Sequence, residues 1–172
     1  TIGRRQRQMC IRDRFIAEAF KDGENQFKDG NFSRSDTQLC LEVVDLDLYQ
    51  TLNGFVKKAF EQYTSVYSGI LQNNDPVSTW TTKVQKTKAG GGYHQWHCEN
   101  GQFLYRDRVL AWMVYLNTVP SQSGGGTDFL HQKLTLQPEA GTIVLWPASY
   151  THVHRGGFLT GNVDKYIATG WF

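Results

Sequence analysis

Residues 126–147, GTDFLHQKLTLQPEAGTIVLWP, contain three short runs of apolar and β-branched residues, at 126–130, 132–137 and 141–147, with glycine, proline and polar residues between them. Runs of this length between turn residues are typical of antiparallel strands. The pattern extends outward from this stretch, and further strands are expected at 79–88, 93–99, 108–117, 150–155 and 164–172. About eight strands with regular turn signals predict a β-sandwich or barrel. Since helices do not alternate with the strands, a doubly wound parallel sheet is not expected.

The half of the chain before this β region predicts a helical support. A helix beginning at Asp47 and ending near Gly69 has one apolar face, which we expect to pack on a sheet: Leu48, Leu52, Phe55, Val56, Ala59, Tyr63 and Val66. A short helix at 15–20, a polar loop at 22–38 and an edge strand at 39–44 are also expected. A chain of 172 residues suits one domain, which we place at 15–172, with a helical support at 15–75 and a β core at 76–172.

The first fourteen residues, TIGRRQRQMCIRDR, differ in character from the rest. They contain five arginines against one aspartate, although the net charge of the whole chain is only +2. The string RQMCIRD resembles the translation of a sequencing-adapter DNA, so we interpret 1–14 as a non-native or disordered segment. A basic arm for nucleic acid is the alternative, but no aromatic residue lies between these arginines, and nucleic acid is not an expected partner.

Other classes are excluded by composition. Three cysteines without a C-x-x-C pair indicate neither a disulfide framework nor a zinc ribbon. The sequence has no apolar run of about 18 residues and no secretory signal pattern, so we expect a cytoplasmic protein without a membrane partner.

The histidines suggest a metal site. On a strand over 93–99, His97 and Glu99 point to the same face, since side chains alternate. A third ligand has to come from a distant strand, where His152 and His154 are the candidates. Two histidines and one carboxylate are the ligands of non-haem iron(II) oxygenases. By itself H-x-E is a weak signal, because most histidines of β proteins have structural roles, and we assign none to His94 or His131.

Several further motifs follow in a fixed order: Gly92-Tyr93 before His97-x-Glu99, Val114–Asn117, Gly125-Gly126-Thr127-x-Phe129, Pro138-x-x-Gly141, His154-Arg155-Gly156 and Lys165-Tyr166-Ile167-x-Thr169-x-Trp171. With them, residues 84–172 resemble the 2-oxoglutarate- and Fe(II)-dependent oxygenases of the prolyl 4-hydroxylase-like branch. The resemblance covers about half of the chain. It implies a mainly β fold with flanking helices (α+β), in which a double-stranded β-helix, or jelly roll, forms the core.

The resemblance also implies roles for individual residues. His97, Glu99 and His154 would hold Fe(II), with His154 favoured over His152 by the His-Arg-Gly string. The far carboxylate of 2-oxoglutarate would be bound by a buried lysine, a hydroxyl and an apolar wall, with a tyrosine as a further contact: Lys165, Thr169, Trp171 and Tyr115. Two features depart from the family pattern. The carboxylate is Glu where Asp is usual, and the lysine lies eleven residues after the distal histidine, about one more than usual.

The implied activity couples decarboxylation of 2-oxoglutarate to succinate with hydroxylation of a C–H bond, and ascorbate is a candidate further cofactor. The primary substrate is open, with a peptide or amino acid, such as a prolyl residue, favoured. Two alternatives are a cupin-type metal enzyme and a catalytically silent jelly-roll binding module. Cupins place an H-x-H pair before the lone histidine, which is the reverse of the order here, and intact His97, Glu99, His154 and Lys165 argue against a silent module.

Overall fold

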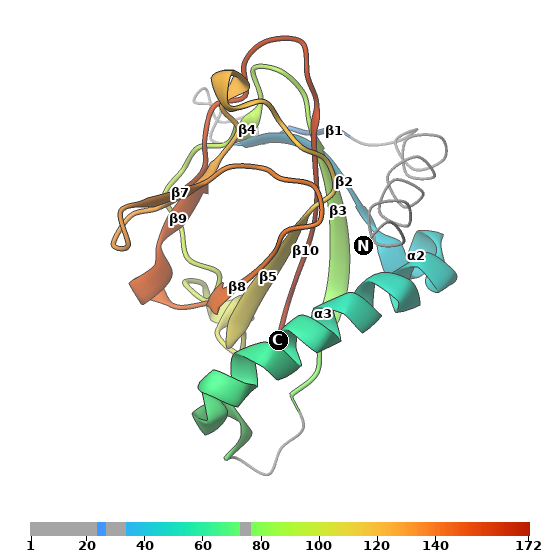
Figure 1. The fold of residues 1–172 in the computed structure, drawn as a ribbon, viewed down its shortest axis with the longest axis vertical. Helices are drawn as coiled ribbons and strands as arrows, with labels where there is room; N and C mark the ends of the chain where they lie inside the picture. The colour runs from blue at the N-terminus through green and yellow to red at the C-terminus, as the bar shows by residue number, and fades with distance from the viewer. Residues whose placement is uncertain (1–23, 27–33, 73–76) are drawn as a thin grey trace.

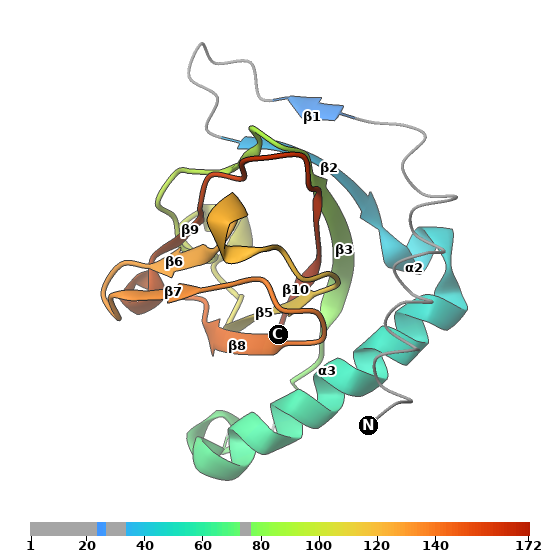
Figure 2. The ribbon, with the colours of Figure 1, turned by 45° about the horizontal axis from the view of Figure 1, so that its top comes forward.

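The computed structural model describes residues 24–26, 34–72 and 77–172, and the expected helix at 15–20 and the segment 1–14 lie outside them. Two antiparallel sheets form the core (Figures 1 and 2). The larger has the order β1-β2-β3-β10-β5-β8, with β4 beside β2, and the smaller has the order β7-β6-β9. Their bounds are β1 Glu24–Gln26, β2 Arg34–Cys40, β3 Trp80–Thr87, β4 Gly92–Tyr93, β5 Leu110–Tyr115, β6 Thr127–Phe129, β7 Leu134–Leu136, β8 Ile143–Pro147, β9 His154–Gly156 and β10 Lys165–Trp171.

The helices lie on one side of this core. They are α2 (Leu41–Val44) and α3 (Leu46–Val66), with short 3-10 turns elsewhere, among them η4 (Tyr150–His152). In Figure 2, α3 runs along the outside of the large sheet, while β6, β7 and β9 lie on the opposite side. The predicted mainly β jelly-roll fold with flanking helices is confirmed. Within the described residues, no helix has the length and apolar character needed to cross a bilayer.

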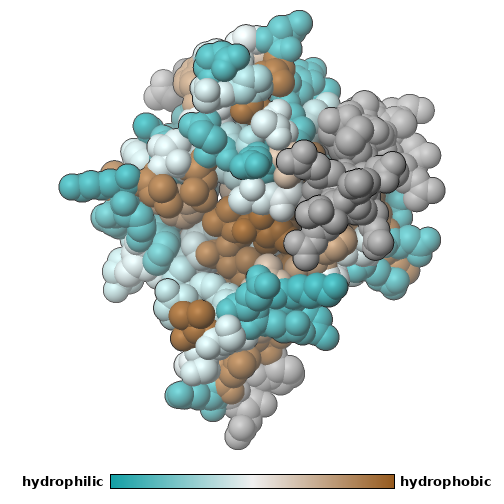
Figure 3. All heavy atoms as spheres, in the orientation of Figure 1, coloured by the Kyte–Doolittle hydropathy of each residue, from teal (hydrophilic) through white to brown (hydrophobic). Residues whose placement is uncertain are grey.

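Strand β5 separates two apolar layers, and for this reason all six of its residues are buried. Its residues 110, 112 and 114 pack toward α3 with Leu48, Leu52 and Val56. Its residues 111, 113 and 115 join the inner cluster between the sheets, with Phe129, Trp146 and Trp171 among its members. Figure 3 shows apolar residues gathered at the centre of one face, in the region between α3 and β8. The helix therefore covers one face of the large sheet and leaves the other for the interior of the core.

The start of α3 differs from the prediction by two residues. Asp45, not Asp47, is the N-cap, and its carboxylate accepts a hydrogen bond of 2.9 Å from the backbone amide of Leu48. The helix ends at Val66, before Gly69, and residues 68–71 form a 3-10 turn. Both aspartates are good capping residues, so the sequence alone could not separate them.

This cap gives a first prediction. We expect Asp45→Ala to lower the free energy of unfolding by about 1 kcal/mol, because an amide in the first turn loses its acceptor. Asp47→Ala is the matched control, since Asp47 is exposed in the same turn, and only the interaction of its charge with the helix dipole is lost, a few tenths of a kcal/mol. Urea unfolding measures both. Equal losses in the two variants would contradict the assignment of the cap.

The polar residues at 34–38 form a strand where a loop was predicted, and the expected strand at 39–44 ends at Cys40, where α2 begins. This strand, β2, pairs with β3, so its backbone hydrogen bonds are satisfied whatever its side chains are. Arg34 and Asp36 line a cavity whose wall contains both polar and apolar residues, and they do not pack in an apolar core. An apolar pattern therefore could not reveal this strand.

Candidate metal centre and cosubstrate pocket

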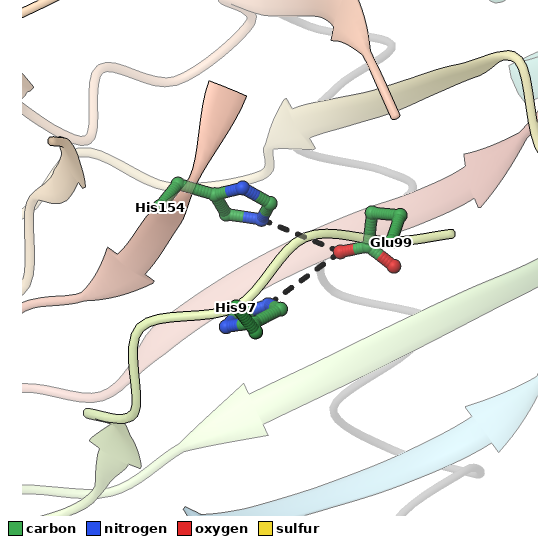
Figure 4. Close-up of side chains that lie close together, drawn as sticks. All are labelled: His97, Glu99 and His154. Carbon is green, nitrogen blue, oxygen red and sulfur yellow. Dashed lines mark ion pairs between the residues drawn. The ribbon is translucent and has the colours of Figure 1, made fainter. Parts of the chain in front are cut away.

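His97, Glu99 and His154 come together although 57 positions separate the two ends of the set. One ligand atom from each lies within 4.8 Å of the other two. The Nε2 atoms of His97 and His154 lie 3.5 and 3.3 Å from the same Glu99 oxygen, Oε1. Figure 4 shows the three side chains pointing toward one another, with His154 on β9 and the other two on the segment after β4. The structure thus brings together the three predicted ligands.

Backbone pairing, not strand alternation, places His97 and Glu99. The predicted strand over 93–99 is wrong, because β4 ends at Tyr93. His97 and His154 exchange backbone hydrogen bonds of 3.0 and 2.9 Å in an isolated bridge. The amide of Glu99 then donates to the carbonyl of Ala148 at 2.9 Å, within a turn. The bridge and the turn fix both ligand-bearing segments to the strands around them.

The hydrogen bonds of the Nδ1 atoms of both histidines indicate that Nε2 is the nitrogen left for a metal. Nδ1 of His97 lies 2.8 Å from the carbonyl of Gln95, and Nδ1 of His154 lies 2.9 Å from the carbonyl of His152. A carbonyl oxygen only accepts, so each Nδ1 carries the proton and each neutral ring presents a lone pair at Nε2. Two such lone pairs and a carboxylate oxygen facing one another need a positive charge among them, either a proton on one of the rings or a metal ion. The residues therefore fit a divalent metal.

Glu99 is held from behind by two donors. Its Oε2 accepts hydrogen bonds from Nε1 of Trp171 at 2.8 Å and from Nη1 of Arg108 at 3.3 Å. Burial alone would raise the pKa of this carboxyl, but hydrogen bonds and charge from His154 and His97, when these rings are protonated, hold the pKa well below its usual range. The carboxylate is therefore ionised with Oε1 turned toward the histidines, which favours binding through one oxygen.

The three ligands lie in the wall of a cavity of about 480 Å³ that also contains the Lys165 side chain. Lys165 is 5% exposed, and its Nζ donates to the carbonyl of Gly125 at 2.7 Å. No carboxylate of the described part of the chain forms an ion pair with this amine. Burial lowers its pKa to about 8, against the opposing charge of Asp36. A buried ammonium without a counter-ion is costly, and it is the kind of group that binds a carboxylate of a ligand.

The remaining predicted cosubstrate residues lie at different depths. Thr169 and Trp171 line the cavity on the same face of β10 as Lys165, as alternation predicts. The Thr169 hydroxyl donates to the carbonyl of Trp112 at 2.8 Å, so its proton is engaged there. Tyr115 is fully buried and does not line the cavity, and its hydroxyl donates to Oγ1 of Thr127 at 2.8 Å. Tyr115 therefore lies behind the cavity wall, where its hydroxyl is bonded to the lining residue Thr127.

The other histidines lie outside the cluster. His152 is on η4, and its Nδ1 is 3.0 Å from the Thr151 hydroxyl. Its backbone carbonyl, by contrast, fixes the ring of His154. His94 stacks on Phe158 with ring centroids 4.3 Å apart, which is a packing role.

Arg108 is a residue of the site that sequence reasoning missed. It is 8% exposed, and its guanidinium lies 3.6 Å from the ring centroid of Trp171 and 4.0 Å from that of Tyr105. The only sequence signal is a basic residue directly before the apolar run of β5. Lys83, on β3, also lines the cavity without having been predicted.

A scan against protein-family models matches residues 82–172, just over half of the chain, to the 2OG-Fe(II) oxygenase superfamily. No curated protein matches the sequence. Solved structures with a similar fold include a prolyl-4-hydroxylase from Pseudomonas putida, at 18% identity and a TM-score of 0.70 over 98% of this chain and 84% of that one. A viral collagen prolyl hydroxylase from Paramecium bursaria Chlorella virus-1 has 17% identity and a TM-score of 0.69 over 97% and 89%.

Another similar structure is a prolyl hydroxylase from Trichoplax adhaerens in complex with a hypoxia inducible factor peptide fragment. It has 19% identity and a TM-score of 0.72 over 98% of this chain and 76% of that one. At such identities these likenesses concern the fold.

Proposed function

Because the chain belongs to the 2OG-Fe(II) oxygenase superfamily, we propose that it hydroxylates an amino-acid side chain, and specifically a prolyl residue in a peptide. The cofactors of the family are Fe(II) and 2-oxoglutarate. One observation carries the proposal: the His97, Glu99 and His154 ligand atoms converge in the same cavity as the buried ammonium of Lys165, which has no counter-ion among the described residues. The three structures of similar fold named above are of prolyl hydroxylases, one of them with a peptide bound, and this supports a peptide as the substrate.

Different residues of the chain would bind the metal and the cosubstrate in such a site. His97, Glu99 and His154 would hold Fe(II), which supplies the activation of dioxygen that couples cosubstrate decarboxylation to C–H hydroxylation. Lys165 would bind the far carboxylate of 2-oxoglutarate, since a buried ammonium in the cavity wall orients a dianion as well as binding it.

Aromatic side chains restrict water around the distal ligand. The ring of His154 packs edge-on against Trp146, with centroids 5.0 Å apart, and lies 5.6 Å from the ring of Phe129. Its side chain is 7% exposed. A dry, packed environment limits side reactions with solvent and keeps the ligand ring in one orientation.

The test has two stages. Under nitrogen, Fe(II) and 2-oxoglutarate together should give the weak visible charge-transfer band of the chelate. After admission of air, a proline-containing peptide should gain one oxygen atom, in step with the formation of succinate. Ascorbate, which we propose as a reductant, is included in one series and omitted from another.

His154→Ala is the control, because it removes one predicted ligand. It should show neither the band nor succinate. Well-folded wild-type protein that forms no chelate would contradict the function as a whole. Succinate formation that no proline-containing peptide stimulates would contradict the substrate alone. A catalytically silent binding module would form no succinate with any peptide.

A further inference from the structure

The charged side chains that line the cavity leave an excess of positive charge. They comprise four cations and two carboxylates: Arg34, Lys83, Arg108, Lys165, Asp36 and Glu99. Bound Fe(II) and the 2-oxoglutarate dianion neutralise each other. The loaded cavity therefore keeps an excess of about two positive charges when its histidines are neutral, which favours a second anionic ligand.

Three of the four cations have an evident counter-ion. Nε of Arg34 lies 2.7 Å from Oδ2 of Asp36, whose side chain is 4% exposed. Arg108 lies 3.3 Å from the carboxylate of Glu99. Under the function proposed above, the counter-ion of Lys165 would be the far carboxylate of 2-oxoglutarate. The fourth cation is the one to explain.

Among the described residues, no carboxylate forms an ion pair with Lys83, although the charge of Glu99 acts on it from a longer distance. Its Nζ lies 5.4 Å from the ring centroid of Trp171, over the indole, and the side chain is half-buried in the cavity wall. Burial and the charges of Arg34 and Arg108 lower the pKa of its amine, against the opposing charges of Cys40 and Glu99. A lysine kept in such surroundings costs stability, and a ligand that supplies the missing negative charge offsets this cost.

The sheet register separates Lys83 from the site of Lys165. Lys165 of β10 lies opposite Thr87 of β3, whereas Lys83 lies opposite Thr169. These two positions of β3 are four residues apart, about 13 Å along the strand. Lys83, on β3, lies beside the end of β10 at which the indole of Trp171 donates a hydrogen bond to Glu99. It therefore belongs to the metal end of the cavity and not to the end that holds the far carboxylate.

Resting on the proposed function, we propose that Lys83 binds a carboxylate of the primary substrate, close to the residue that is hydroxylated. Lysine presents a point charge on a long flexible stem, which suits a carboxylate whose position varies from one substrate to another. The carboxylate can come from an acidic side chain next to the target residue or from the α-carboxylate of a terminal target residue. The substrate class is thus an acidic peptide or a peptide that ends at the target.

Binding under nitrogen tests this without turnover. Wild-type protein loaded with Fe(II) and 2-oxoglutarate is titrated with two matched pairs of blocked peptides. In one pair, a Gly-Pro-Glu-Gly peptide is compared with Gly-Pro-Gln-Gly. In the other, a Gly-Pro peptide with a free carboxyl end is compared with its amide. We expect the acid of at least one pair to bind at least about tenfold more tightly than its amide, as for a hydrogen bond between charged groups.

Variants at residue 83 test whether Lys83 causes the preference for the acid peptide over its amide. Lys83→Met should abolish it, Lys83→Arg should restore it, and Lys86→Met should leave it unchanged, because Lys86 pairs with Asp164 at 2.9 Å and does not line the cavity. The pair that shows the preference identifies the source of the carboxylate.

Three outcomes overturn the inference. The first is that acids and amides bind equally or that neither binds, and the second is that Lys83→Met keeps the preference. The third is that Lys83→Met weakens 2-oxoglutarate binding as strongly as loss of Lys165 does. The chelate band is recorded in the same samples. If it forms while the preference is absent, only this inference fails. If the wild-type protein forms no chelate, the proposed function fails with it.

Discussion

Lys165→Met is expected to abolish measurable binding of 2-oxoglutarate and, at the same time, to make the metal-free protein more stable. Burial lowers the pKa of this amine from 10.5 to about 8, and the difference corresponds to about 3 kcal/mol at neutral pH. Methionine avoids this cost, but the carbonyl of Gly125 loses its donor, which costs about 1 kcal/mol. A net gain of about 2 kcal/mol is expected. Urea unfolding and titration of the chelate band measure the two effects.

The pH dependence of the free energy of unfolding and of cosubstrate affinity gives a second test of Lys165. The unfolded chain keeps this proton up to pH 10.5, whereas the folded chain releases it at about pH 8. The unfolded state therefore binds more protons between these values, and the wild-type free energy of unfolding gains a contribution that rises with pH across this window. Affinity for 2-oxoglutarate should fall above pH about 8, because the ammonium is lost.

Lys165→Arg is the control for charge. It should keep cosubstrate binding through this range of pH, since a guanidinium does not titrate there. Lys165→Met should lack the rise in stability. If the methionine variant instead loses stability, Lys165 is a structural residue. If it binds 2-oxoglutarate as the wild type does, the far carboxylate lies elsewhere.

The strands around the site could be predicted where strand alternation coincides with burial. Alternation along a strand at 164–172 puts residues 165, 167, 169 and 171 on one face, and all four line the cavity. The final strand, β10, lies between β3 and β5, so both of its edges are paired, and the alternation persists through the register shift between Thr169 and Trp171. Alternation gave the correct face without knowledge of its neighbours.

Strand alternation could not predict the position of a side chain where hydrogen bonds between distant segments take the place of regular strand pairing. Glu99 reaches the cluster because its amide donates to Ala148, in a turn that the H-x-E spacing does not reveal. The pairing of His97 with His154 likewise joins segments 57 positions apart. Arg108 was missed because a basic residue just before an apolar strand resembles an exposed strand end, and Lys83 because a lysine within a mostly polar strand resembles a solvent-facing residue. Only the fold shows that both side chains face the cavity.

Glu99→Ala is expected to abolish binding of divalent metal, because it removes the only carboxylate of the three-ligand cluster. Two neutral imidazoles alone form an incomplete site for Fe(II), which uses two histidines and a carboxylate. Anaerobic titration with Fe(II), or with Co(II) followed by its visible absorption, measures the affinity. Thermal unfolding gives an independent readout, since a metal that binds only the folded state raises the midpoint of the wild type and should not raise that of the variant.

Glu99→Asp is the matched control, because it keeps the charge but shortens the side chain by one methylene. The present glutamate spans from the histidines at Oε1 to Trp171 and Arg108 at Oε2. Aspartate cannot keep all of these contacts, so we expect it to bind metal with an affinity about 10–100-fold below the wild type, as when groups that orient a ligand are lost. An alanine variant that binds as tightly as the aspartate variant would show that the carboxylate does not ligate the metal. An aspartate variant equal to the wild type would show that Trp171 and Arg108 do not orient the ligand.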